Sequence, residues 1–139
     1  MSKTFSTTRF VQFSETDMGG IVHFSQYYRY MEEAEHAFFR SLGLSIVDTS
    51  QTPPVSWPRV TCAFDFLAPL RFEDEPTLTI TVTRLGRKSI SYRTDVTLGE
   101  TKVATGTATI VCCELSDAGM ISRAIPENIR ELLTPYTTN

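Results

Sequence analysis

The chain has 139 residues, which is close to the commonest length of one domain, so we predict a single domain over residues 1–139. Its 13 Lys and Arg against 16 Asp and Glu give a net charge of −3, which argues against a nucleic-acid-binding surface. The first residues form no apolar targeting segment, and no apolar run reaches membrane-spanning length. We therefore expect a cytoplasmic protein that does not enter a membrane.

Residues 4–13 are rich in Thr, Phe and Val and predict a first strand. Residues 25–42 predict the only strong helix, because apolar residues recur there at helical spacing. This apolar stripe consists of Tyr27, Met31, Ala34, Phe38 and Leu42. Gly43 follows the stripe and suits a left-handed cap at the helix end. Residues 44–57 have no clear period and predict a loop.

The second half of the chain predicts strand after strand. Apolar and polar residues alternate over residues 59–66, 77–83 and 90–98. The dipeptides Gly86-Arg87 and Gly99-Glu100 separate these runs and predict tight hairpin turns.

The last of these strands has one face of small residues, Ala104, Gly106 and Ala108. Such a face leaves room for a bulky neighbour, and a helix lying close against the sheet is the simplest occupant. One striped helix followed by an antiparallel meander predicts an α+β domain.

The cysteines do not predict a disulfide or a metal site. Cys112 and Cys113 are adjacent, and neighbours on a strand point to opposite faces. The chain has only two histidines, His23 and His36, so no zinc-binding spacing can be assembled. We predict no metal and interpret these two cysteines and Cys62 as small buried apolar side chains.

The strongest functional signal lies between Glu15 and Glu32. Asp17 is on a glycine-bearing loop, seven residues ahead of an apparent helix start at Phe24. Helix N-termini present free backbone N–H groups and partial positive charge, which favour a developing oxyanion. A carboxylate beside such an end supplies a base or a nucleophile. This pairing predicts acyl-transfer chemistry.

Each of these polar residues also has a structural interpretation. Asp17 could serve only as a turn former or a helix cap. His23 is a candidate general base, but a packed or loop-ordering histidine is the stronger alternative. Glu15 is expected to be solvated or paired. Glu32 either orders the loop through hydrogen bonds or is an exposed helix residue.

The glycines and aromatic residues near this loop have similar alternatives. Gly19 and Gly20 most simply permit a close approach of the backbone. Tyr27 and Trp57 either line an acyl pocket or pack in the core or in an interface.

Residues 9–114 resemble the hotdog fold, and specifically the 4-hydroxybenzoyl-CoA thioesterase family. The resemblance rests on the Phe-Ser-Glu-Thr-Asp-Met-Gly-Gly-Ile-Val run at residues 13–22, on Tyr27 and Glu32, and on residues 65–72. It implies one long helix wrapped by a curved five-stranded antiparallel sheet. It also implies that two protomers join edge to edge, with the active site at their junction, to give a dimer or a tetramer.

The resemblance assigns roles to the loop by position. It implies that Asp17 is the catalytic carboxylate and that the N–H of Phe24 polarises the thioester carbonyl, and Gly20 matches the glycine of the family pattern. Two positions depart from one bacterial subgroup of the family. That subgroup usually has His where this chain has Phe24, with its own His23 one residue earlier, and Arg where this chain has Glu35.

The resemblance also implies that coenzyme A lies across the outside of the sheet. Arg87, Lys88 and Ser89, which open a predicted strand, are then candidates to bind its phosphates, and Arg123 is a weaker candidate. The alternative is that these residues only face water.

The function predicted from the sequence is an acyl-CoA thioesterase acting on a small aromatic or a short-to-medium-chain acyl group. No cofactor is expected, because coenzyme A is part of the substrate. One alternative is a non-catalytic hotdog protein that binds acyl-CoA as a sensor or scaffold. Another is a small ligand-binding α+β domain of different topology.

Overall fold

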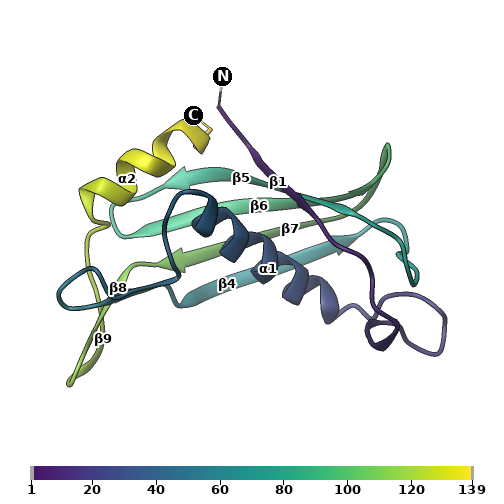
Figure 1. The fold of residues 1–139 in the computed structure, drawn as a ribbon, viewed down its shortest axis with the longest axis horizontal. Coiled ribbons are helices and arrows are strands. Elements are labelled where there is room, and N and C mark those ends of the chain that lie inside the picture. Colours follow the sequence, from purple (N-terminus) through teal and green to yellow (C-terminus); the bar gives the residue numbers. More distant parts are fainter. Residues whose placement is uncertain (1, 139) are drawn as a thin grey trace.

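The computed structural model describes residues 2–138 and places a helix across one face of a five-stranded antiparallel sheet (Figure 1). The strand order is β1-β5-β6-β7-β4, so β1 and β4 form the two edges. The five strands are β1 (Phe5–Thr8), β4 (Arg59–Phe66), β5 (Thr77–Leu85), β6 (Ser89–Leu98) and β7 (Thr101–Val111). The predicted antiparallel meander is confirmed by the β5–β6–β7 register.

The helix across the sheet is α1 (Gln26–Ser41), which has 16 residues and is shorter than the predicted range 25–42. The long helix that the resemblance implies is therefore not observed. The predicted stripe on α1 is confirmed for Tyr27, Met31, Ala34 and Phe38, which are all buried, whereas Leu42 lies just past the helix end and is half-buried. Gly43 ends the helix with φ +76°, as the predicted left-handed cap requires.

The structure adds a second sheet and a second helix that the sequence analysis missed. Two of the strands of the four-stranded sheet, β2 (Val47–Asp48) and β3 (Val55–Ser56), lie in the segment predicted to be a loop. The other two are β8 (Cys113–Ser116) and β9 (Gly119–Ser122), and α2 (Glu127–Leu133) follows them. Strands of two residues and a helix of seven are too short to carry a recognisable period.

The first predicted strand is also shorter than expected. Of residues 4–13, only Phe5–Thr8 (β1) pair with β5, and the chain then leaves the sheet and forms the 3₁₀ turn η1 (Phe13–Glu15). A second such turn, η2 (Thr134–Tyr136), follows α2. The segment between β1 and α1 therefore forms a loop at one end of the sheet (Figure 1).

The small-residue face of β7 is occupied differently from the prediction. A Cβ atom at Gly106 would lie 2.6 Å from the ring of Phe64, which comes from the neighbouring strand β4. The Phe64 ring in turn contacts Tyr28 of α1, with their centroids 5.2 Å apart. An aromatic ring, rather than the helix itself, therefore fills the space above Gly106.

The cysteine predictions are partly confirmed. Cys112 and Cys113 are buried, and burial raises the pKa of the Cys112 thiol to about 11. Cys62 is exposed on the edge strand β4, so its interpretation as a buried side chain is wrong. Among residues 2–138, no three His, Cys, Asp or Glu side chains gather where they could hold a metal ion. Within the same residues, no helix is both long enough and apolar enough to cross a membrane.

Candidate active site

The loop that carries Asp17 is closed by its own backbone. Thr16 and Val22 form an isolated antiparallel bridge at its base. The Asp17 N–H donates to the Ile21 carbonyl at 2.9 Å, and the Gly20 N–H donates to the Asp17 carbonyl at 2.9 Å. Gly20 has φ +77°, a conformation that favours glycine because other residues carry a Cβ. The loop conformation therefore requires glycine at this position.

The Asp17 carboxylate both shapes the loop and faces a cavity. Its Oδ1 accepts the Gly19 N–H at 2.8 Å, so the interpretation of Asp17 as a turn former is correct. A Cβ at Gly19 would lie only 3.1 Å from the same Oδ1, which supports the predicted close approach. Asp17 also lines the cavity, so the structural and chemical interpretations do not exclude each other.

The cavity has a volume of about 600 Å³ and lies between the Asp17 loop, the start of α1 and the segment after β4. This size falls within the roughly 300–1,000 Å³ of small-molecule sites. Most of its lining is apolar, which suits an acyl group. The lining residues are Asp17, Ile21, Val22, His23, Phe24, Tyr27, Phe66, Ala68 and Pro69.

Four residues predicted from the sequence therefore meet at this cavity: Asp17, His23, Phe24 and Tyr27. Tyr27 is buried, and burial raises its pKa although a hydrogen bond with the Leu70 backbone opposes the rise. The sequence analysis did not predict the wall formed by Ile21, Val22 and residues 66–69. The apolar run that ends β4 was the available signal, but strand alternation alone does not show that it turns into a cavity.

Phe24 lines the cavity two residues before α1 begins at Gln26, so the predicted helix start at Phe24 is slightly early. The N–H groups next to Phe24 are used: His23 donates to the Glu15 carbonyl at 2.9 Å, and Ser25 donates to the His23 Nδ1 at 3.3 Å. Within residues 2–138, the Phe24 N–H has no acceptor. His23 also lies 2.7 Å from the Ser25 hydroxyl, so it orders the helix start as well as lining the cavity.

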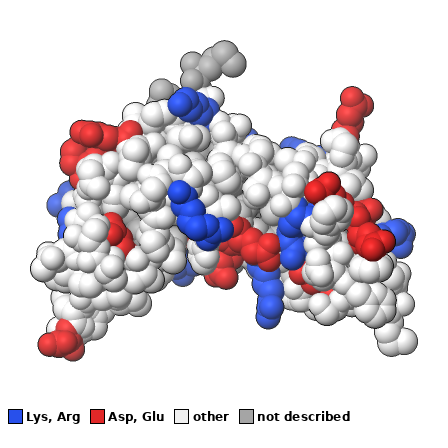
Figure 2. All heavy atoms as spheres, viewed as in Figure 1, with Lys and Arg blue, Asp and Glu red and all other residues white. Residues whose placement is uncertain are grey.

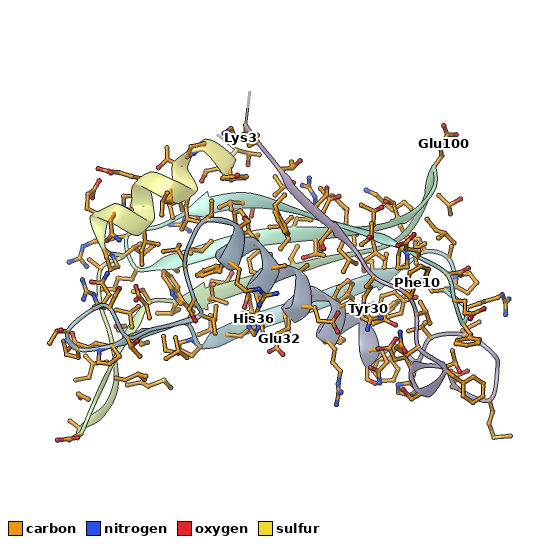
Figure 3. All side chains as sticks on the ribbon, in the orientation of Figure 1. Lys3, Phe10, Tyr30, Glu32, His36 and Glu100 are labelled. Carbon is orange, nitrogen blue, oxygen red and sulfur yellow. The ribbon has the colours of Figure 1, made fainter. Side chains whose placement is uncertain are left out.

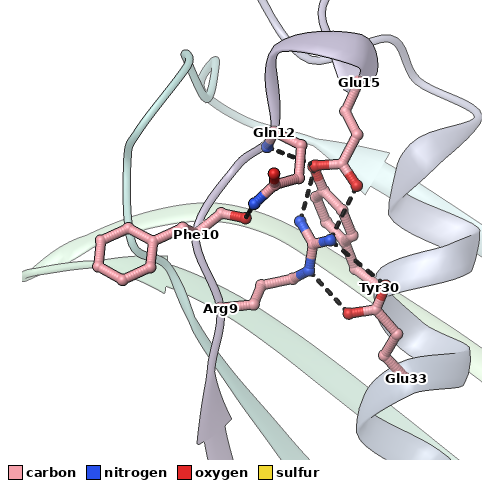
Figure 4. A network of polar contacts seen from close by, with 6 residues as sticks. All are labelled: Arg9, Phe10, Gln12, Glu15, Tyr30 and Glu33. Carbon is pink, nitrogen blue, oxygen red and sulfur yellow. Dashed lines mark hydrogen bonds and ion pairs between the residues drawn. The ribbon is translucent and has the colours of Figure 1, made fainter.

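Glu15 is paired, as one of its two predicted alternatives stated. Arg9 binds both of its carboxylate oxygens at 2.8 Å, and the Tyr30 hydroxyl donates to the same carboxylate at 2.9 Å (Figure 4). Burial alone would raise the pKa of Glu15, but the hydrogen bonds from Arg9, the Gln12 N–H and Tyr30 hold it below its ordinary value. Glu15 is therefore a carboxylate held inside a network rather than a solvated group.

Glu32 does not order the loop. Its carboxylate lies 3.8 Å from Arg59 Nη1 of β4 and is half exposed. Glu32 and His36 follow each other along α1 (Figure 3), one turn apart and away from the Asp17 loop. The alternative of an exposed helix residue describes Glu32 better.

The remaining predicted site residues lie elsewhere in the chain. Trp57 does not line the cavity but packs in the core against Phe39, with ring centroids 5.8 Å apart. Arg87 and Lys88 lie in the β5–β6 turn and Ser89 opens β6, at the opposite end of the sheet from the Asp17 loop (Figure 1). Arg123 is tied to this end as well, since its N–H donates to the Cys112 carbonyl. A single chain therefore does not bring these residues to the cavity.

Charge is mixed over the face that carries α1 (Figure 2), where acidic and basic side chains lie side by side across the middle. A concentrated basic patch of the kind that nucleic acid needs is not seen on this face.

The comparisons with known proteins agree with this geometry. Residues 19–105 match the model of the Thioesterase superfamily. A 1,4-dihydroxy-2-naphthoyl-CoA hydrolase from Nostoc punctiforme is 25% identical over 94% of this chain and 86% of its own length. The enzyme of the same name from Synechococcus sp. strain WH7803 is 30% identical, over 76% of this chain and 73% of its own.

A solved gentisyl-coenzyme A thioesterase superposes with a TM-score of 0.78 at 26% identity, over 94% of this chain and 99% of that one. The matched family segment contains Gly20 and Phe24 and begins two residues after Asp17. More than half of the chain lies within that segment, and the sheet and α1 occupy most of it. The chain therefore belongs to the Thioesterase superfamily, has the hotdog fold and is a thioester hydrolase.

Proposed function

We propose that this chain hydrolyses the thioester bond of aromatic acyl-CoA substrates, with Asp17 as the catalytic carboxylate. The observation that carries the proposal is the cavity in which the Asp17 carboxylate and the start of α1 face an apolar space. The names of the relatives support an aryl group, because they are enzymes for naphthoyl-CoA and gentisyl-CoA esters.

The proposed chemistry uses two groups of the chain. The Phe24 N–H donates to the thioester carbonyl oxygen and stabilises the negative charge that develops on it. Asp17 then either attacks the carbonyl carbon, which forms a mixed anhydride as the C–S bond breaks, or takes a proton from an attacking water molecule. In the first route water then cleaves the anhydride, which releases the acid and restores the Asp17 carboxylate; in the second the water adds directly to the carbonyl carbon. In both routes coenzyme A leaves as its thiol.

The aromatic lining supports an aryl substrate over a plain alkyl chain. Tyr27 and Phe66 lie edge to face with centroids 5.1 Å apart, and Phe24 is exposed beside them. Ring edges and faces of this kind bind another ring with about 0.5–1.5 kcal/mol beyond the burial of area. A short-to-medium alkyl group fits the same volume but gains less from these rings.

The proposal is tested with a set of coenzyme A esters and a thiol-detecting assay. We expect gentisyl-CoA, benzoyl-CoA and 1,4-dihydroxy-2-naphthoyl-CoA to give higher kcat/KM than hexanoyl-CoA and palmitoyl-CoA. A preference for hexanoyl-CoA would be consistent with a thioesterase but would contradict the proposed aromatic acyl group. The alternative of a non-catalytic binding protein predicts tight binding of these esters with no release of thiol.

A homo-oligomer is part of the proposal, because it would bring the β5–β6 end of one protomer close to the Asp17 end of the other. Strand β4 is an exposed edge, and unpaired edges favour pairing with another strand. Antiparallel pairing of two β4 strands would reverse one protomer with respect to the other. The β5–β6 turn of the partner would then approach the end of this chain that carries Asp17. Arg87 and Lys88 could bind the coenzyme A phosphates there only in such an assembly.

Replacing Arg87 and Lys88 with Ala is expected to raise KM for the coenzyme A ester several-fold while kcat changes little. The reason is that charged side chains bound to phosphate contribute equally to the ground state and the transition state. Steady-state kinetics with gentisyl-CoA measures both constants. An unchanged KM would mean that Arg87 and Lys88 only face water and do not bind coenzyme A.

Light scattering at micromolar concentration is expected to give the mass of a dimer or a tetramer. The edge strand β4 carries exposed Val60 and Phe66, and the following Leu67 is also exposed. Pairing with a second copy would cover this apolar edge. A monomer with full thioesterase activity would contradict a shared active site.

A further inference from the structure

The loop between β1 and α1 is held by a cluster of charged residues that do not line the cavity (Figure 4). Arg9 forms a two-pronged bond with Glu15 and a further bond from its Nε to Glu33, at 2.7 Å. Its guanidinium lies over the ring of Tyr30, 4.1 Å from the centroid. The cluster therefore joins the end of β1, the turn η1 and the first half of α1.

Glu15 is the point where this cluster meets the candidate catalytic groups. Its side chain accepts hydrogen bonds from Arg9, Tyr30 and the Gln12 N–H, and its backbone carbonyl accepts one from the His23 N–H at 2.9 Å. Asp17 lies two residues after Glu15, and the Phe24 N–H comes one residue after His23. Glu15 thus fixes both the segment that leads to Asp17 and the segment that leads to the Phe24 N–H.

We propose that Arg9 and Glu15 act as a positioning clamp, which holds the Asp17 carboxylate in register with the Phe24 N–H. This inference rests on the proposed function of Asp17. Arg9 and Glu15 are positioning residues rather than catalytic ones, because neither lines the cavity.

The desolvation of the Arg9 and Glu15 charges costs free energy, which supports a role for this pair beyond stability. The side chains of Arg9 and Glu15 are only 16% and 12% exposed, so both charges have lost most of their water. Apolar residues of similar size often stabilise a fold as well as such a pair does. What an apolar pair cannot supply is direction, because the two parallel N–H···O bonds fix the angle of the carboxylate as well as its distance.

The size of the expected effect follows from the geometry of acyl transfer. A displacement of about 1 Å between reacting groups can lower the rate by roughly 100-fold. Loss of the clamp leaves the cavity walls in place, so substrate binding should suffer much less than turnover. The clamp therefore predicts a fall in kcat with little change in KM.

The test compares Arg9→Met, Arg9→Lys and Glu33→Gln with the wild-type oligomer on gentisyl-CoA. Arg9→Met keeps an unbranched apolar side chain but removes the guanidinium, and with it the bonds to Glu15 and the contact with the Tyr30 ring. We expect its kcat to fall by about tenfold or more and its KM to change by less than about threefold. Arg9→Lys retains the charge without the two-pronged bond and should recover part of the loss.

Glu33→Gln is the matched control. The Glu33 carboxylate is half exposed and touches Arg9 from the side of the helix, so its loss leaves the Arg9–Glu15 bond intact. Its kcat should stay within about twofold of wild type. All rates are measured at a temperature at which circular dichroism shows each variant to be folded, so that reduced stability alone does not lower kcat.

Each outcome decides between the clamp and its alternatives. A wild-type kcat in a less stable Arg9→Met protein would reduce the cluster to a structural role and overturn the proposal. A raised KM with unchanged kcat would make Arg9 a binding residue and overturn it as well. If Arg9→Met does not fold, Tyr30→Phe tests the clamp by removing only the hydroxyl bonded to Glu15, and it should lower kcat without raising KM. Full activity of Asp17→Asn would instead overturn the proposed function itself, whatever Arg9 does.

Discussion

Replacing Asp17 with Asn is expected to lower kcat by at least about 10²–10⁴-fold, the range that general acid–base catalysis supplies. Asn is nearly isosteric with Asp, and its side-chain oxygen can still accept the Gly19 N–H that Asp17 Oδ1 accepts at 2.8 Å. The turn is therefore preserved, and only the negative charge is lost. An amide can neither attack a thioester as a carboxylate does nor take a proton from water, so both proposed routes are blocked.

Asp48→Asn is the control for this substitution, because Asp48 forms the same kind of turn. Its Oδ1 accepts the Ser50 N–H at 2.9 Å, but it lies in β2 and does not line the cavity. This variant should hydrolyse gentisyl-CoA at the wild-type rate. The thiol-release assay measures both variants, and their circular dichroism spectra should match that of the wild type. Activity of Asp17→Asn within a few-fold of wild type would remove Asp17 from the mechanism.

The parts of the fold that were predictable from the sequence are those with a sustained period. The stripe on α1 and the alternation along β5 and β6 each repeat often enough to exceed chance. The two-residue strands β2 and β3 offer no repeat, and β3 pairs with β8, nearly 60 residues later. Such pairing depends on tertiary contacts, which a local sequence pattern does not predict.

The candidate site divides in a similar way. The Asp17 loop was recognisable because a carboxylate, glycines and a helix start follow one another along the chain. The Arg9–Glu15 bond was not, because it joins two irregular segments whose side-chain directions no periodicity fixes. The sequence left two alternatives open for Trp57, a pocket residue or a core residue, because a buried aromatic residue looks the same in sequence whether it faces a ligand or Phe39.

Replacing Glu35 with Leu is expected to destabilise the fold by roughly 3 kcal/mol, since it leaves a partly buried arginine without its main partner. Glu35 is 2% exposed on α1, and its Oε1 accepts a hydrogen bond from Arg59 Nη2 at 2.7 Å. The Tyr92 hydroxyl of β6 donates to the same oxygen. Burial and the adjacent Glu35 carboxylate raise the pKa of Tyr92, so the phenol keeps the proton that it donates. The sequence distinguished Glu35 only as a departure from an arginine of related proteins, whereas the structure makes it the bond between the helix and two strands.

Thermal unfolding followed by circular dichroism measures this loss, at about 3 °C for each kcal/mol in a chain of this size. Glu32→Gln is the matched control, because its carboxylate faces the same guanidinium from 3.8 Å but is half exposed, and its loss should cost less than about 0.5 kcal/mol. The double variant Glu35→Leu with Arg59→Met separates two causes of the effect. If the uncompensated charge of Arg59 is responsible, the double variant should recover most of the stability, leaving a loss of about 1 kcal/mol for the hydrogen bond of Tyr92. If the double variant is no more stable than Glu35→Leu, the loss comes from packing around the helix, and the ion pair is not what holds α1 to β4.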